Sequence, residues 1–157
     1  GHLALQQAME QLYPDGLIDR TNTRVVSKAS PCLTDAAIYD IGGRYQFNSF
    51  YVSDAIDGLF VVQRIDTKKT VGVQMKNGLK PKEIDQLGAI AVKGELPACD
   101  LDKLKNLEDD FTETLLSTDP KENFIVTEIS DFNWNPILKS TYIKTDIINK
   151  NALKCGK

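Results

Sequence analysis

The sequence predicts a mixed α/β (α+β) fold, in which helices flank a central mixed β-sheet that contains a three-strand meander. Two patterns carry this prediction: apolar residues recur at helical spacing in three segments, and strand-like apolar or alternating runs lie between them. The chain of 157 residues is 41% hydrophobic and 26% charged, which is typical of a globular protein with a buried core. We therefore expect residues 1–157 to form one domain.

The expected elements combine apolar periodicity with turn residues at their ends. The expected helices cover residues 3–13, 81–94 and 101–116. The expected strands cover residues 44–52, 58–65, 70–76 and 123–129, and residues 24–27 are compatible with a short strand. Pro14 ends the first helix, Pro81 begins the second, and Asp119–Pro120 ends the third. The pattern is weak in residues 17–43, where Ser30–Pro31 indicates a turn, and the segment after Pro136 fits a helix or a strand.

Composition narrows the class of protein. No apolar run reaches the roughly 18–20 residues that span a bilayer, and no basic-then-apolar leader opens the chain. The three cysteines Cys32, Cys99 and Cys155 form no CxxC or Cys/His cluster, so neither a disulfide framework nor a zinc site is indicated. We expect a soluble protein of a reducing, cytoplasmic compartment.

The first two residues, Gly1 and His2, look like the remnant of a cleaved tag, which is compatible with a domain excised from a longer protein. His2 is the only histidine, so histidine-based mechanisms are set aside with it. The net charge of −3 argues against nucleic acid, yet residues 139–157 carry five lysines and one acid. This tail could meet phosphates or be a solvated terminus.

Three polar groups lie at the ends of the apolar hairpin at residues 58–76. In the strand "TVGVQMK", two-residue periodicity puts Gln74 and Lys76 on the face opposite the valines. An antiparallel partner strand would carry Asp57 back beside them. Asp57 and Gln74 oxygens would suit a hard cation such as Mg²⁺ or Mn²⁺, and Lys76 would stabilise charge developing on a phosphate. The alternative is structural: Asp57 caps a turn, Gln74 meets a polar neighbour, and Lys76 snorkels.

The segments "IDGLF", "VGVQMK" and "FIVTEISDF" resemble the PD-(D/E)xK nuclease superfamily, and most closely the Mrr-type restriction endonuclease catalytic domain. The resemblance implies a restriction-endonuclease-like core with DNA as its substrate. It makes Asp57 the metal-ligating aspartate, Gln74 the replacement for the usual glutamate ligand, and Lys76 the catalytic lysine. Glu10, on the first helix, matches an accessory acid. Residues 96–121 look like an insertion.

The resulting hypothesis is a metal-dependent endonuclease of restriction or defence type that hydrolyses DNA phosphodiester bonds. One alternative is a nuclease toxin domain of a larger secreted protein, delivered into a target-cell cytoplasm. Another is a non-catalytic nuclease-like binding or immunity protein. An immunity-type partner and a homodimer are both compatible with these hypotheses. Trp134 and Phe132 could stack on bases, or could be core aromatics.

Overall fold

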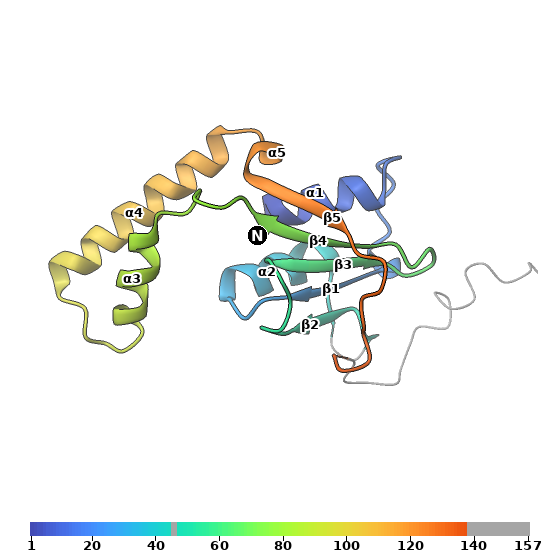
Figure 1. The fold of residues 1–157 in the computed structure, drawn as a ribbon, viewed down its shortest axis with the longest axis horizontal. Helices are drawn as coiled ribbons and strands as arrows, with labels where there is room; N and C mark the ends of the chain where they lie inside the picture. Colours follow the sequence, from blue (N-terminus) through green and yellow to red (C-terminus); the bar gives the residue numbers. More distant parts are fainter. Residues whose placement is uncertain (45–46, 138–157) are drawn as a thin grey trace, which may run out of the picture. The chain divides into compact units, whose positions relative to one another are not determined.

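The computed structural model describes residues 1–44 and 47–137, which contain helices and five strands that form one mixed sheet (Figure 1). The helices are α1 (His2–Leu12), the 3-10 turn η1 (Arg20–Asn22), α2 (Pro31–Ile41), α3 (Lys82–Ala91), α4 (Ala98–Ser117) and α5 (Pro120–Asn123). The strands are β1 (Thr23–Ser27), β2 (Phe50–Val52), β3 (Phe60–Arg64), β4 (Thr70–Met75) and β5 (Phe124–Glu128). The predicted α+β class with a central mixed sheet is confirmed.

The strand order is β2-β1-β3-β4-β5, which differs from the predicted meander. β1 pairs with β2 in parallel and with β3 antiparallel, while β3 and β4 form an antiparallel hairpin. The prediction that three strands follow one another across the sheet is wrong, because β1 lies between β2 and β3. β2 is also shorter than the predicted strand at residues 44–52. Of the predicted meander, the antiparallel hairpin of β3 and β4 is present in the sheet.

The helix α2 replaces the turn predicted at Ser30–Pro31. Ser30 is its N-cap residue and Pro31 its first residue, where a proline fits because the first helical N–H needs no partner within the helix. Gly42 ends the helix in the left-handed conformation, at a φ of 65°. Ala36, Ala37 and Ile41 are buried from this helix, so the same residues that indicated a turn begin an amphipathic helix.

The core lies on both faces of the sheet. Helices α1 and α2 contact each other and cover one face, where they contact β3 and β1 respectively. On the opposite face, Val26, Tyr51, Val61 and Trp134 pack in one cluster with Ile56. Trp134 is 7% exposed, so it is a core aromatic, as one of the two sequence interpretations held. The central strands are therefore apolar on both faces, which explains their near-continuous apolar sequence.

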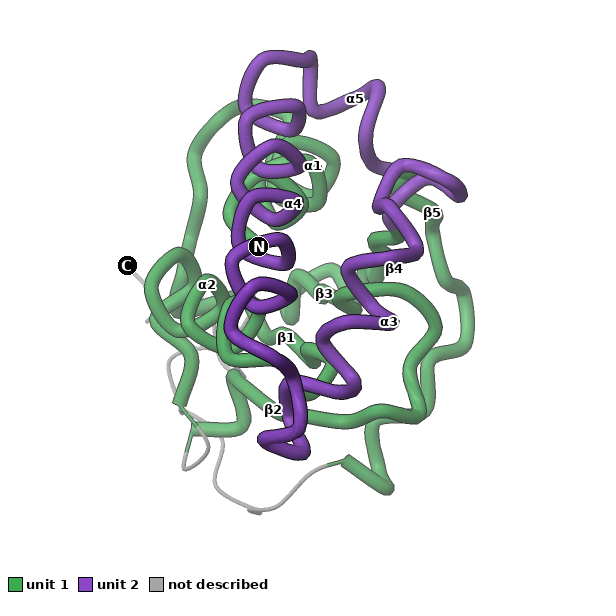
Figure 2. Tube along the Cα trace, turned by 90° about the vertical axis from the view of Figure 1, so that its left-hand side faces the viewer, with its two compact units in different colours: residues 1–74, 125–157 green, residues 75–124 purple. Residues whose placement is uncertain are grey.

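The chain divides into two compact units, shown in different colours in Figure 2. The first consists of Gly1–Gln74 with Ile125–Lys157, and the second of Met75–Phe124. In the second unit α3 and α4 contact each other, and Lys103 Nζ lies 2.6 Å from Glu83 Oε1. Only Ile84 is buried in α3 and only Leu104 in α4, so this unit has a small core.

The basic segment at residues 139–157 lies outside the described residues.

Candidate functional site

Asp57 and Gln74, two of the predicted site residues, line the same pocket of about 350 Å³, together with Thr127 and Ile129. Gly58 explains why they are close: a Cβ there would lie 2.4 Å from Val73 O and 2.6 Å from Gln74 Cγ. Leu59 N also donates to Val73 O at 2.7 Å. The segment that carries Asp57 therefore runs directly against the end of β4. Asp57 and Gln74 are both exposed.

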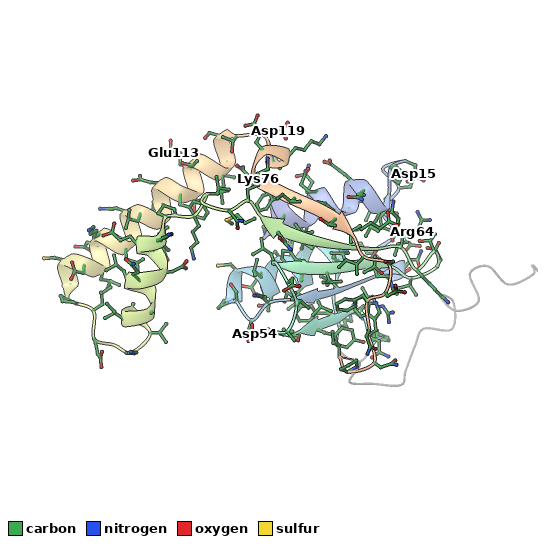
Figure 3. The ribbon with its side chains drawn as sticks, viewed as in Figure 1. Asp15, Asp54, Arg64, Lys76, Glu113 and Asp119 are labelled. Carbon is green, nitrogen blue, oxygen red and sulfur yellow. The ribbon has the colours of Figure 1, made fainter. Side chains whose placement is uncertain are left out.

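Lys76, the predicted catalytic lysine, has its observed contacts within residues 75–124. Its Nζ donates to the carbonyl oxygen of Lys121 at 3.2 Å, and its main-chain N donates to Asn123 O at 2.9 Å. Figure 3 labels Lys76 just beyond the end of β4. This contact is the one expected of a strand-end lysine whose ammonium group finds a main-chain oxygen. A catalytic role for Lys76 stays a prediction.

Glu10, the predicted accessory acid, is not brought to Asp57 and Gln74. It lies on α1, accepts a hydrogen bond from Gln6 Nε2 at 3.2 Å, and lines a different pocket. Among residues 1–44 and 47–137, no group of three or more His, Cys, Asp or Glu side chains is arranged to hold a metal ion. A Mg²⁺ or Mn²⁺ ion on Asp57 and Gln74 stays a prediction.

The pocket that contains Glu10 holds a second constellation, which sequence reasoning missed. His2 Nδ1 lies 2.9 Å from both carboxylate oxygens of Asp40, which is on α2. The His2 ring also meets the Tyr39 ring edge to face, with centroids 5.7 Å apart. Two contacts from neighbouring residues of α2 thus fix the orientation of the imidazole. The sequence alone does not indicate this pair, because Gly1–His2 resembles a tag remnant and because Asp40 lies on α2, a helix that the weak pattern of residues 17–43 does not predict.

The pocket beside this pair has a volume of about 430 Å³. Most of its lining surface is apolar, and the polar side chains in the lining are those of His2, Gln6, Glu10 and Asp40. The lining residues are His2, Leu5, Gln6, Met9, Glu10, Tyr13, Gly16, Ile18 and Asp40. Leu5, Met9 and Tyr13 are buried, so the wall belongs to the core under α1. A concave apolar site with a few convergent polar groups is the usual form of a small-molecule pocket.

Tyr13 is held rigidly in this wall. Its hydroxyl lies 2.7 Å from Thr23 Oγ1 and donates to the main-chain oxygen of Asp19 at 3.1 Å. Burial raises the pKa of Tyr13, although the hydrogen bond with Thr23 and the nearby Arg64 oppose the rise. Arg64 lies over the Tyr13 ring, with Cζ 4.7 Å from the centroid. The neutral phenol is therefore a fixed part of the pocket.

The His2–Asp40 geometry defines what the pair can do chemically. A carboxylate at Nδ1 favours the tautomer with the proton on that nitrogen, which leaves Nε2 able to accept a proton. In this arrangement the carboxylate holds the imidazole in one orientation. The pair can therefore exchange a proton with a bound molecule, or hydrogen-bond to it through Nε2.

The fold and this pocket define the class: an α+β protein in which His2 of α1 and Asp40 of α2 form a pair beside a largely apolar pocket. Residues 1–125 of the chain match the family described as "FmdE, Molybdenum formylmethanofuran dehydrogenase operon". Because this match extends over most of the 157 residues, the chain belongs to the FmdE family. No curated protein matches the chain.

Family membership corrects the functional hypothesis drawn from the sequence. The resemblance to PD-(D/E)xK nucleases, and to the Mrr-type domain in particular, is wrong, and DNA is not supported as a substrate. The toxin and nuclease-like immunity alternatives are overturned by the same match. The physical reason is that a Gln-x-Lys tripeptide at the end of an apolar strand is a common pattern, and in this sheet β1 separates β2 from β3, so the strands form no three-strand meander. Among the described residues, no helix is both long and apolar enough to cross a membrane.

Proposed function

We propose that this chain is a ligand-binding accessory protein that works with a molybdenum formylmethanofuran dehydrogenase. The observation that carries the proposal is the FmdE family match across residues 1–125, whose description ties the family to the operon of that enzyme. Genes of one operon commonly serve one process, so the protein is expected to support the assembly or the activity of the dehydrogenase.

The His2–Asp40 pocket is the proposed working site. Its apolar wall would bury the body of a small molecule, and the oriented imidazole would recognise a polar group on that molecule. His2 is well placed for this task, because its side chain is 63% exposed while Asp40 behind it is 27% exposed. The imidazole thus stays accessible and its carboxylate partner is more sheltered.

Deletion of the gene in a host that encodes both proteins tests the proposal. We expect formylmethanofuran dehydrogenase activity in cell extracts to fall, and expression of this chain from a plasmid to restore it. A dehydrogenase that needs no molybdenum serves as the control and should be unaffected. Unchanged formylmethanofuran dehydrogenase activity in the deletion strain would refute the proposed role.

A further inference from the structure

Arg24 of β1 is a sheltered cation whose guanidinium makes no ion pair among the described residues. It lies opposite Gln63 of β3 and is partly buried. Burial lowers the pKa of Arg24 to about 10, against a smaller opposing effect of Tyr51, so the side chain is still charged at neutral pH. Removing a cation from water without pairing it is costly. An anion bound at Arg24 would offset that cost.

Gln63 holds the guanidinium in place. Arg24 Nε donates to Gln63 Oε1 at 2.8 Å. The amide nitrogen of Gln63 donates in turn to Thr70 Oγ1 at 2.7 Å and to Lys68 O at 3.2 Å. Because both donors of the amide are engaged, its oxygen is directed at Arg24. These bonds use Arg24 Nε and leave its two terminal nitrogens with no hydrogen bond to the described residues, in the fork geometry that matches a carboxylate.

Aromatic rings form the wall beside this cation. Arg24 Cζ lies 4.0 Å from the centroid of the Trp134 ring. The Phe132 ring meets the Trp134 ring edge to face, with the two ring centroids 4.8 Å apart. Trp134 Nε1 is buried and has no hydrogen-bond partner among residues 1–44 and 47–137. Trp134 therefore offers a ligand the surface of its ring, since its indole N–H is buried.

These side chains line a pocket of about 390 Å³ within the first unit. Its charged lining residues are Arg24, Lys68 and Asp131, which leaves one net positive charge. Asp131 would repel a dianion such as phosphate more strongly than a monoanion. Ile65 and Phe132 add apolar surface to the lining. The balance of charge and apolar surface favours an organic monoanion over inorganic phosphate.

We propose that this pocket binds a small organic carboxylate, with its carboxylate on the Arg24 guanidinium and its apolar body against Trp134 and Phe132. This site is distinct from the His2–Asp40 pocket, with which it shares no lining residue. It also stands independently of any role with the dehydrogenase, because it rests on the unpaired cation and the aromatic wall.

The single tryptophan of the chain makes the test direct, because all tryptophan signals come from Trp134. Benzoate is the probe, benzamide is its neutral analogue, and inorganic phosphate is the competing anion. We expect benzoate to change the Trp134 fluorescence saturably and to shift the one indole N–H resonance in an NMR spectrum. Benzamide and phosphate should bind at least tenfold more weakly. Absence of a saturable change with benzoate at millimolar concentration, or tighter binding of phosphate, would overturn the proposal.

Amino-acid substitutions test whether benzoate binds at Arg24. Arg24→Gln should weaken benzoate binding on the order of tenfold or more, because a charge-assisted bidentate contact is lost. Arg20→Gln is the matched control, since Arg20 is exposed, bonds to Tyr39 O and lines another pocket. It should bind benzoate as the wild type does. Should Arg24→Gln fold poorly, Lys68→Gln in the exposed turn should still weaken binding a few-fold. Wild-type affinity in a folded Arg24→Gln variant, or in Lys68→Gln, would contradict the site.

Discussion

At the scale of single residues, Asp66 shows how the fold keeps a sheltered carboxylate charged. Its side chain is 7% exposed. Arg64 donates two hydrogen bonds to it, from Nε to Oδ1 at 2.9 Å and from Nη2 to Oδ2 at 3.3 Å. Thr67 N donates a further hydrogen bond at 2.8 Å. Burial pushes the pKa of Asp66 upward, but these bonds outweigh it, and the pKa lies below the ordinary 3.8.

This lowered pKa predicts a pH dependence of stability. The stabilising contribution of Asp66 is fully present above the ordinary pKa of 3.8 and disappears as the pH falls through the lower folded-state pKa. Asp66→Asn should therefore reduce the free energy of unfolding by about 1–3 kcal/mol at neutral pH, with a smaller loss in strong acid. Urea melts across this pH range measure it. Asp57→Asn, at an exposed carboxylate, is the control. An equal loss in the free energy of unfolding at all pH values would contradict the lowered pKa of Asp66.

A second residue-scale prediction concerns the imidazole of His2. The contact of Nδ1 with Asp40 predicts that neutral His2 carries its proton on Nδ1. Because the chain has one histidine, ¹⁵N NMR of the imidazole reads this tautomer directly. Asp40→Ala should shift the population toward the Nε2–H form. A neutral His2 protonated mainly on Nε2 in the wild type would contradict the observed geometry.

The two candidate sites differ in how far the sequence could predict them. The proximity of Asp57 to Gln74 follows from local pattern, because a hairpin with a short turn fixes which residues lie opposite each other. The His2–Asp40 pair joins residues 38 positions apart through the packing of α1 on α2. No periodicity in the sequence encodes that packing, and the interpretation of Ser30–Pro31 as a turn removed the helix that carries Asp40.

At the scale of elements, the close approach of the segment before β3 to the end of β4 depends on Gly58. Its φ of 84° lies in the left-handed region, and a Cβ would come within 2.4 Å of Val73 O. Both the backbone conformation and the space therefore require glycine. This contact holds the Asp57 segment against the strand that carries Gln74.

Gly58→Ala should accordingly destabilise the fold by about 2 kcal/mol or more, from left-handed backbone strain together with the steric clash. Gly88→Ala in α3 is the matched control, because a Cβ there meets nothing within 4 Å. That substitution should be neutral or stabilise α3 by about 0.5–1 kcal/mol. Thermal melts of both variants decide the matter, and a Gly58→Ala variant as stable as the wild type would show that this approach is not constrained.

Strand order was the part of the fold that sequence patterns could not supply. The apolar runs of β3 and β4 predict these two strands, but the pattern of β1 is weak and its place between β2 and β3 is a long-range pairing. The parallel pairing of β1 with β2 needs a crossover, here formed by α2. Because Ser30–Pro31 indicates a turn in the sequence, the sequence predicts no crossover there, and an antiparallel meander is the simplest arrangement of the remaining strands.

At the scale of the whole molecule, the two units differ in how much they bury. Val25, Val26, Val61 and Val62 of β1 and β3 are at most 1% exposed, whereas α3 and α4 bury one residue each. Hydrogen exchange should follow this difference, because amide protection depends on the cost of local opening. Amides of β1 and β3 should exchange at least tenfold more slowly than those of α3 and α4. Equal protection would show that both units open only together.

The central claim is that an FmdE-family chain supports a formylmethanofuran dehydrogenase through the pocket at His2 and Asp40. The direct test replaces the chromosomal gene with Asp40→Ala or, as the control on the same helix, with Asp35→Ala, whose side chain is exposed. Immunoblots confirm equal amounts of both proteins, and dehydrogenase activity is measured in the extracts. We predict that Asp40→Ala reproduces the loss seen on gene deletion while Asp35→Ala keeps wild-type activity. Wild-type dehydrogenase activity in the Asp40→Ala strain, at normal protein abundance, would contradict the claim.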